Sequence, residues 1–416
     1  MKKLCAVILL CSTILLLFYP YHTDAGIRSN YPGIKNSSPE KEGDAVMVAA
    51  MADAQLDIDS PSAVLIEGST GTVIYEKNKD ERLKPASITK VMTLLLIFEA
   101  LDSKQIALTD EVSVSEYAAS MGGSQVYLEP YEKQTVDTMI KCISIASAND
   151  ASVAMAELIA GSEEEFVAQM NKRAKELGMN NTHFVNCCGL DTDDHYSSAY
   201  DVALMSRELI TKHPQISQYS TVWMDTIVHT TKRGQIEFGL TNTNKMVKFY
   251  QGITGLKTGS TSLAKYCLSA SARRANMDLI AVVMAAPDTK TRFMEASKML
   301  NYGFANYSIY ADDSTQMEIT PVQVNRGVTD LVQGKAANNF SYLCSKGKST
   351  EAIRKEVVLY EKVNAPVEVG TKLGDINYYY EDSNIGAVDI VASEAVGKAG
   401  FHNNFFKVLR RYFVGN

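Results

Sequence analysis

The amino-acid sequence predicts an α+β domain over residues 57–310, a small all-β domain over residues 316–395 and an amphipathic helix over residues 401–416. The first prediction rests on strand-like runs at both ends of a helical block, a pattern typical of a mainly antiparallel sheet with helices. The second rests on short alternating runs of apolar and polar residues, separated by Gly and Asn turns. The third rests on a terminal segment whose aromatic and basic residues divide between two helical faces.

The N-terminus has the form of a secretory signal peptide. Met1-Lys2-Lys3 precede an apolar run from Leu4 to Phe18, and Thr23-Asp24-Ala25 offers a small-residue cleavage site. The alternative, an uncleaved membrane anchor, needs roughly 20 apolar residues, which is longer than this run. We therefore expect a signal peptide over residues 1–25, export of the protein, and a polar, flexible leader over residues 26–56.

Length, charge and cysteine content narrow the class of protein. A chain of 416 residues is long enough for two or three domains, and its net charge of −7 argues against a nucleic-acid partner. The five cysteines beyond the signal peptide are an odd number and have neither disulfide-framework nor zinc spacing. We expect buried or idle thiols, with one adjacent pair in a loop. These cysteines are Cys142, Cys187, Cys188, Cys267 and Cys344.

The predicted elements follow one another along the chain. Residues 63–66 and 72–75 form a hairpin around Gly68-Ser69-Thr70-Gly71, and an apolar helix follows Pro85. Further helices are expected over residues 135–143, 154–160, 163–177, 201–209 and 291–304, a loop over 180–200, and strands over 226–230, 253–257, 266–272 and 279–284. In the second domain the expected strands cover 322–324, 355–360, 367–369 and 387–391.

The helix after Pro85 carries two polar residues in an otherwise apolar stretch. Ser87 and Lys90 are three residues apart, so they share one helical face with side-chain origins about 5–6 Å apart. A lysine amine held in a dry place loses proton affinity, and it can then activate a weak hydroxyl nucleophile. Alone, Ser-x-x-Lys is more often a capping serine beside a surface lysine, because short motifs match by chance.

Two further short motifs favour the catalytic interpretation of Ser87 and Lys90. Ser147-Ala148-Asn149 lies in a predicted break between two helices, and Lys257-Thr258-Gly259 is expected to end a strand. The order Ser-x-x-Lys, Ser-x-Asn and Lys-Thr-Gly is a known signature of penicillin-binding proteins and class A β-lactamases. Each motif alone is weak. All three, in order and each in the expected local structure, point to an acyl-transferring serine enzyme.

The chain from about residue 64 to residue 307 resembles the serine D-alanyl-D-alanine carboxypeptidases, the low-molecular-mass penicillin-binding proteins. The segments that carry the resemblance are Pro85–Lys90, Gly122–Ser124, Ser147–Ala151, His183–Asn186, Gly189–Asp191 and Gly255–Gly259. The resemblance implies a β-lactamase/transpeptidase-like fold, with the β-domain and basic C-terminus in that family's usual layout. Cys187-Cys188 departs from it, standing where the family's loop often has Pro-His.

The resemblance also implies the reaction. A cell-wall peptide ending in D-Ala-D-Ala acylates Ser87 and loses its last D-alanine, with Lys90 taking the Ser87 proton and Ser147 relaying a proton to the leaving amine. Water then releases the acyl group, and neither metal nor cofactor is needed. β-Lactam antibiotics are the covalent inhibitors that such an enzyme implies.

The same resemblance assigns the substrate-binding residues. Asn149 holds the peptide through its amide, and Lys257, in the Lys-Thr-Gly motif that Gly259 completes, supplies positive charge for the terminal carboxylate. Thr258 and Ser260 donate hydroxyl hydrogen bonds, and the backbone amides of Ser87 and Ser260 form the oxyanion hole.

Two other functions share these acylation residues. A β-lactamase adds a glutamate that activates the deacylating water, and Glu176 with Asn180 is the one loose match. Gly178 between them indicates a helix end, so Glu176 is expected to be an exposed helix residue. The second alternative is a penicillin-recognising sensor with little turnover. His183 and His195 are assigned no catalytic role, because no acidic partner is evident for either.

The C-terminal segment predicts a partner of a different kind. On a helix its apolar and basic residues gather on opposite sides. The apolar ones are Phe405, Phe406, Val408, Leu409, Tyr412 and Phe413, and the basic ones are Lys407, Arg410 and Arg411. This pattern is typical of a helix lying in a membrane surface, although a helix packed on its own domain is the alternative. We expect the enzyme on the outer face of the cytoplasmic membrane.

Overall fold

The computed structural model describes residues 56–231 and 234–401. The expected signal peptide, nearly all of the leader and residues 402–416 of the expected amphipathic helix lie outside the described residues. Within the described part of the chain, no helix combines the length and the apolar character needed to cross a bilayer.

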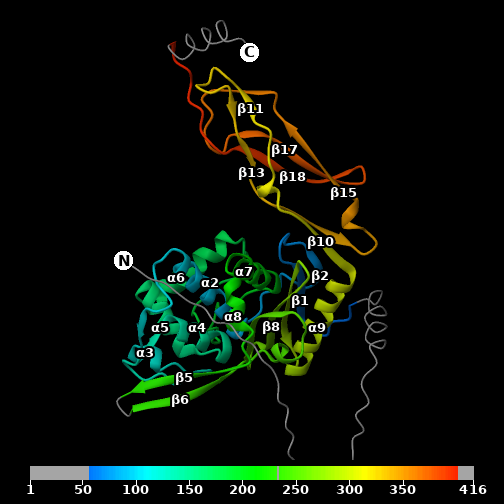
Figure 1. The fold of residues 1–416 in the computed structure, drawn as a ribbon. Coiled ribbons are helices and arrows are strands. Elements are labelled where there is room, and N and C mark those ends of the chain that lie inside the picture. The colour runs from blue at the N-terminus through cyan, green and yellow to red at the C-terminus, as the bar shows by residue number, and fades with distance from the viewer. Residues whose placement is uncertain (1–55, 232–233, 402–416) are drawn as a thin grey trace, which may run out of the picture. The chain divides into compact units, whose positions relative to one another are not determined.

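A five-stranded antiparallel sheet forms the centre of the first domain, in the order β2-β1-β9-β8-β7 (Figure 1). Its strands are β1 (Ser62–Glu67), β2 (Val73–Lys77), β7 (Ile253–Thr261), β8 (Lys265–Arg274) and β9 (Met277–Ala286). The first hairpin closes through Glu67, whose carboxylate accepts hydrogen bonds from the backbone amides of Ser69 and Thr70. Strands distant in sequence, β1 and β9, pair at the middle of the sheet.

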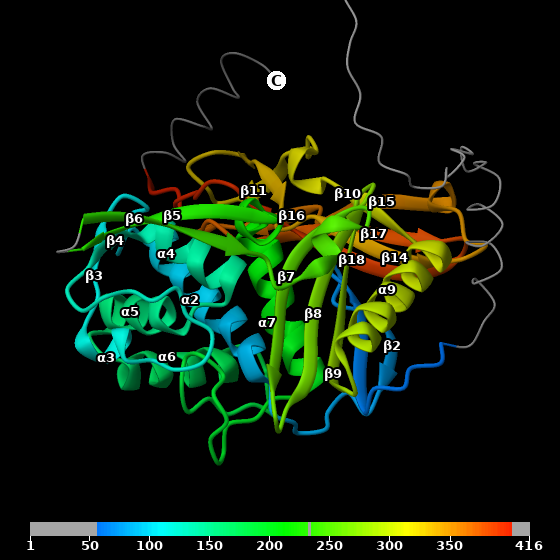
Figure 2. The same ribbon diagram turned by 90° about the horizontal axis from the view of Figure 1, so that it is seen from below.

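Helices cover both faces of this sheet (Figure 2). Because side chains alternate along a strand, Val64 and Ile66 face one hydrophobic cluster while Ala63 and Leu65 face another. The first cluster is shared with the helical block, and the second with α9 (Thr289–Asn306). The block consists of α2 (Lys90–Asp102), α3 (Glu116–Ala119), α4 (Val136–Lys141), α5 (Asn149–Ala160), α6 (Glu163–Glu176), α7 (Ala199–Lys212) and α8 (Ser217–Ser220).

Shorter elements complete the first domain. They are the 3-10 turns η1 (Ala86–Thr89), η3 (Pro214–Ile216) and η4 (Lys245–Lys248), the π-turn η2 (Cys142–Ala146), and the strand pairs β3 (Glu111–Ser113) with β4 (Lys133–Thr135) and β5 (Met224–Thr231) with β6 (Gly234–Thr241). The sequence predicted one strand in this region, over residues 226–230. Strand β5 contains it and is longer, whereas β6 was not predicted. Most of its side chains are exposed, so they give little of the strict alternation that marks a half-buried strand.

The second domain is all-β, as predicted. It contains the sheets β12-β11-β16 and β13-β18-β17-β15, and a two-stranded ladder pairs β10 with β14. The elements are β10 (Tyr307–Asp312), η5 (Ser314–Gln316), β11 (Val322–Asn325), β12 (Leu331–Val332), β13 (Gly334–Ala336), β14 (Phe340–Ser345), η6 (Thr350–Ala352), β15 (Ile353–Leu359), β16 (Lys362–Asn364), β17 (Lys372–Tyr380) and β18 (Ser383–Ala392). Its apolar core is separate from the two of the first domain.

Two local predictions were wrong. Residues 367–369 form no strand: Val367 makes a single bridge to Val396, and the chain turns at Gly370, whose φ of +87° ends any extended run. Lys257-Thr258-Gly259 does not end its strand either, because β7 continues to Thr261 against β8. The alternating apolar signal stops before the strand does, since its last residues are partly exposed and polar.

Candidate active site

The nucleophile candidate lies on a tight turn at the start of a buried helix. Ser87 belongs to η1, which leads directly into α2, and its side chain is half-buried while both neighbours are buried. Ala86, just before it, has a φ of +49°, a backbone conformation that non-glycine residues rarely adopt. Strain of this kind persists where surrounding structure imposes it, and it concentrates at functional sites.

Lys90 is fully buried, and its amine lies within hydrogen-bond distance of three oxygen atoms. Its Nζ lies 3.1 Å from Ser87 Oγ, 2.6 Å from Asn149 Oδ1 and 2.7 Å from the carbonyl oxygen of Cys188. The last two acceptors cannot donate a hydrogen bond back. A neutral amine has two N–H donors and one lone pair, so the two shorter contacts take both donors and the lone pair faces Ser87.

Burial also favours this neutral form. It lowers the pKa of the Lys90 ammonium, and nearby negative groups, including Asp150, only partly oppose the shift. The arrangement can therefore do what general-base activation of a serine requires: the base is within hydrogen-bond reach, its orientation is fixed by two other groups, and its proton affinity is reduced.

Ser147 is placed by a change of helical pitch. Helix α4 passes into the π-turn η2, and Ser147 then adopts the left-handed conformation with a φ of +65° before α5 begins. Single π-turns within α-helices are frequent at functional sites. The Ser147 side chain is buried, and its Oγ has no hydrogen-bond partner among the described residues. A buried hydroxyl is thus held two residues before Asn149 with no hydrogen-bond partner among the described residues.

Asn149 is the first residue of α5, and both ends of its side-chain amide are engaged. Besides accepting from Lys90, it donates from Nδ2 to the carbonyl oxygen of Gly122 at 2.7 Å. The structure therefore shows Asn149 orienting the base and tying it to the loop at residues 122–124. To hold a peptide by the same Nδ2, as the sequence suggested, the side chain would exchange the Gly122 carbonyl for the ligand.

Strand β7 supplies the second cation of the site. Lys257 is buried, and the contact that its Nζ makes is with the carbonyl of Thr258, at 3.1 Å. Burial, followed by the nearby charges of Lys90 and Arg292, lowers the Lys257 pKa well below its usual value. Like charges destabilise one another here, so an anion entering the site would relieve the repulsion and favour the charged form of Lys257.

Two hydroxyl-bearing residues, Thr258 and Ser260, follow Lys257 along β7. Thr258 donates its hydroxyl to Thr243 Oγ1 at 2.7 Å, while the Ser260 side chain is exposed. Ser260 also lines a surface hollow of ≈ 450 Å³, together with Thr261, Ser262, Lys265, Tyr266 and Pro287. The end of β7 thus offers hydroxyl groups beside an open space.

Two glycines allow the backbones of the site to meet. A Cβ on Gly259 would lie 2.8 Å from the carbonyl oxygen of Pro85 and 3.0 Å from the backbone nitrogens of Ser87 and Ile88. A Cβ on Gly189 would lie 1.8 Å from the carbonyl oxygen of Ala86. The nucleophile turn is therefore held between β7 and the loop that carries the Cys188 carbonyl.

Residues that the sequence left without a catalytic role have structural roles. His195 is buried with Nε2 2.9 Å from Thr89 Oγ1, and its Nδ1 accepts from the Val185 amide at 3.0 Å. Burial lowers its pKa to about 4, so it stays neutral near pH 7. Glu176, whose side chain is about half exposed, pairs with Lys172 and Arg173 on α6. It is the exposed helix residue that was expected.

Sequence reasoning missed three groups that shape the site. The Cys188 carbonyl holds Lys90, but a backbone acceptor has no sequence signal. Asp150 accepts from the amides of Val126 and Leu128, which fixes the loop after Gly122, and only its place beside Asn149 could have suggested this. Arg292 donates to the Gly259 carbonyl at 3.0 Å. The sequence feature that could have indicated Arg292 was a basic residue on the buried face of the helix predicted over residues 291–304.

Comparison with known proteins agrees with this geometry. Residues 48–288 match the family described as D-alanyl-D-alanine carboxypeptidase, and residues 304–398 match the C-terminal domain of penicillin-binding protein 5. D-alanyl-D-alanine carboxypeptidase DacF of Bacillus subtilis is 45% identical over 348 residues, which is 84% of this chain and 88% of that protein. The chain belongs to the D-alanyl-D-alanine carboxypeptidase family.

Solved structures of this family share the fold. Penicillin-binding protein 5 from Haemophilus influenzae is 30% identical and superposes with a TM-score of 0.70, covering 83% of this chain and 99% of that one. Penicillin-binding protein D2 from Listeria monocytogenes, solved in an ampicillin-bound form, is 30% identical with a TM-score of 0.51 and covers 60% of this chain and 100% of that one. The predicted fold class of the two domains is confirmed.

Proposed function

We propose that this carboxypeptidase removes the terminal D-alanine from peptidoglycan stem peptides through an acyl-enzyme on Ser87. The observation that carries the assignment of residues is the hydrogen-bond set of Lys90. Two acceptors, Asn149 Oδ1 and the Cys188 carbonyl, leave one direction of the amine for Ser87 Oγ. Burial lowers the pKa of that amine, which favours its basic, neutral form.

Acylation then follows from these positions. Ser87 Oγ attacks the carbonyl carbon between the two D-alanines while its proton passes to Lys90. The carbonyl oxygen becomes an oxyanion, which accepts from the backbone amides of Ser87 and Ser260. The C–N bond breaks, and Ser147 donates its hydroxyl proton to the leaving amine while it takes up the proton that Lys90 accepted from Ser87. Free D-alanine departs, and the peptide remains as an ester on Ser87.

We propose that the terminal carboxylate of the peptide binds against Lys257. Burial lowers the pKa of Lys257, and repulsion by the nearby Arg292 guanidinium lowers it further. A carboxylate placed against Lys257 offsets that repulsion. Ser260 donates its hydroxyl to it, and Thr258 does so by exchanging its hydrogen bond to Thr243 for the carboxylate. This requirement accounts for a carboxypeptidase, which acts at a free C-terminus. Penicillins also carry a carboxylate, and we propose that they acylate Ser87 in the same way.

One observation disfavours a β-lactamase. The glutamate that would activate the deacylating water is best matched by Glu176, and that side chain pairs with Lys172 and Arg173 on the surface of α6. Release of D-alanine from a D-Ala-D-Ala peptide, measured beside hydrolysis of nitrocefin, separates the possibilities. We expect turnover on the peptide. Turnover on nitrocefin alone would indicate a β-lactamase, and turnover on neither would indicate a sensor.

The Ser87→Ala variant tests the nucleophile directly. We expect it to lose both D-alanine release and covalent labelling by a fluorescent penicillin, while its thermal unfolding stays that of the parent protein. The matched control is Ser120→Ala, which removes an exposed hydroxyl from the same domain and should leave both activities unchanged. Labelling that persists in Ser87→Ala would place the nucleophile elsewhere.

We further propose that the exported enzyme is held at the outer face of the cytoplasmic membrane by residues 402–416. The support is the sequence pattern alone, with a basic face opposite an aromatic one. A chain ending at residue 401 should still cleave a small soluble peptide, but it should no longer sediment with anionic liposomes. Equal sedimentation of the shortened and full-length proteins would refute the anchor.

A further inference from the structure

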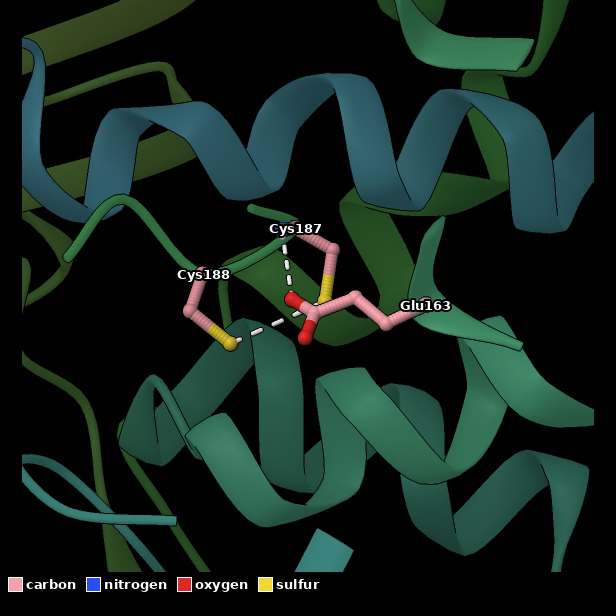
Figure 3. Close-up of side chains that lie close together, drawn as sticks. All are labelled: Glu163, Cys187 and Cys188. Atoms are coloured by element: carbon pink, nitrogen blue, oxygen red, sulfur yellow. Dashed lines mark hydrogen bonds between the residues drawn. The ribbon is translucent and has the colours of Figure 1, made fainter. Parts of the chain in front are cut away.

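A buried pair of thiols lies beside the site and takes no part in the proposed reaction. Cys187 and Cys188 are 0% and 1% exposed, and their sulfur atoms are 3.7 Å apart. Glu163, the first residue of α6, brings its carboxylate to the same place, as Figure 3 shows. One ligand atom from each of the three residues falls within 4.8 Å of the other two.

This spacing is close to that of a metal centre. Two thiolate sulfurs about 2.3 Å from a tetrahedral zinc ion lie about 3.8 Å apart, close to the sulfur separation observed. Thiolates with a carboxylate are a known kind of donor set for zinc and for the softer cadmium ion. Bringing the Glu163 oxygen into the same coordination sphere needs a side-chain adjustment rather than a change of fold, because the atoms already lie together.

The carboxylate is also oriented from outside the cluster. Glu163 accepts from the Cys187 amide at 3.0 Å through one oxygen and from the Tyr117 hydroxyl at 2.7 Å through the other. Outer partners of this kind fix the ligands of metal sites and raise their affinity. Glu163 is only half-buried, so it marks the side from which an ion reaches the two buried sulfurs.

From this arrangement we propose that Cys187, Cys188 and Glu163 form a binding site for a thiophilic divalent cation of the zinc and cadmium type, and that the bound ion inhibits acylation of Ser87. The inhibitory part rests on the proposed function, whereas the binding part does not. Both cysteines bind as thiolates, so their two protons are released when the ion enters.

Inhibition follows from the second role of Cys188. Its carbonyl holds the Lys90 amine at 2.7 Å, and the Cys187 carbonyl accepts from Thr93 Oγ1 at 2.7 Å, so the thiol loop is fixed to α2 on its backbone side. As a thiolate, Cys188 can no longer donate from Sγ to the Asn149 carbonyl, a contact of 3.6 Å, so ion binding disturbs Asn149 and the Lys90 amine that Asn149 orients. Misplacing a catalytic group by about 1 Å can slow a reaction about 10²-fold.

Cadmium provides the test, because cadmium–thiolate bonds absorb in the ultraviolet. The full-length protein, reduced with a phosphine, is titrated with Cd²⁺, and its acylation by a fluorescent penicillin is then timed with and without the ion. We expect one ion per chain, a thiolate charge-transfer band, and acylation at least tenfold slower with the ion. Cys187→Ser should lose the band and the inhibition, whereas Cys344→Ser, which removes a buried thiol of β14, should retain both.

The outcomes are separable. A charge-transfer band that survives in Cys187→Ser, or no band in the parent protein, overturns the site. A bound ion that leaves the acylation rate unchanged overturns the link to Lys90. Each rate is compared with and without Cd²⁺ in the same variant, so a change in a variant's own activity does not enter. If the metal-free enzyme released no D-alanine while Cd²⁺ still bound, the proposed function would fail and the metal site would stand.

Discussion

Replacing Gly259 by alanine tests whether the backbone contact between β7 and the nucleophile turn sets the rate of acylation. The added Cβ would lie 2.8 Å from the Pro85 oxygen and 3.0 Å from the nitrogens of Ser87 and Ile88. Ordinary contact begins at 3.4 Å, so β7 and the turn must separate by about 0.4–0.6 Å. All three neighbours are backbone atoms, and none can move away as the end of a side chain would.

That separation acts on the atoms that react. Catalytic groups need to be held within about 0.5 Å of their productive geometry. Because a misplacement of about 1 Å can reduce a rate about 10²-fold, we expect acylation of Gly259→Ala to be about tenfold slower or worse. Overpacking of this kind should also reduce the free energy of unfolding by about 1–3 kcal/mol.

The assay is the rate of labelling by a fluorescent penicillin, with D-alanine release and thermal unfolding measured on the same samples. Gly239→Ala is the matched control, because a Cβ at this position in β6 would meet nothing within 4 Å. It should acylate at the parental rate. A Gly259→Ala variant that acylated as fast as the parent would show that the turn and the strand are free to separate, and the reasoning would be wrong.

Three more predictions follow from the site and the core. Lys257→Ala should lower kcat/KM on the peptide about 10–100-fold, because a charge-assisted hydrogen bond is worth about 1.5–3 kcal/mol. The control is Lys335→Ala, which removes an exposed lysine of the second domain. Equal kinetics for the two variants would refute the assignment of Lys257 to the carboxylate. The acylation rate should rise with pH and level off below the pKa of an ordinary lysine, about 10.4, because only neutral Lys90 accepts the proton and burial lowers its pKa; a rise confined to higher pH would contradict this. Glu295→Ala should reduce the free energy of unfolding in urea by at least about 2 kcal/mol. The reason is that the buried carboxylate accepts hydrogen bonds from two backbone amides and one hydroxyl at residues 59 and 60. The control is Glu164→Ala, which removes an exposed carboxylate, and an equal loss in the two variants would contradict the prediction.

Much of the fold could be predicted because its signals are local. The hairpin around Gly68, the helix capped by Thr135 and the helix ending at Gly161 each show their turn or cap in a few adjacent residues. The exposed strand β6 shows no such signal. Its pairing with β5 depends on where the chain returns rather than on its own composition.

The candidate site was predictable in its side chains but not in its backbone. Ser87, Lys90 and Ser147 could be proposed because their hydroxyl and amine side chains stand at the spacings of the Ser-x-x-Lys and Ser-x-Asn motifs. The Cys188 carbonyl could not, since every residue carries one and only the folded loop brings this one to Lys90. The engagement of Asn149 with Gly122 was hidden for the same reason, because backbone acceptors leave no trace in composition.

The π-turn at Cys142–Ala146 makes the site sensitive to the length of this segment more than to its side chains. It is one residue wider per turn than an α-helix. Removing a single residue from this turn would rotate the segment that follows it by about 100° about the helix axis. Asn149 would then face away from Lys90. Substitutions of similar size can therefore accumulate here, whereas an insertion or deletion of one residue would disconnect the base from its acceptor.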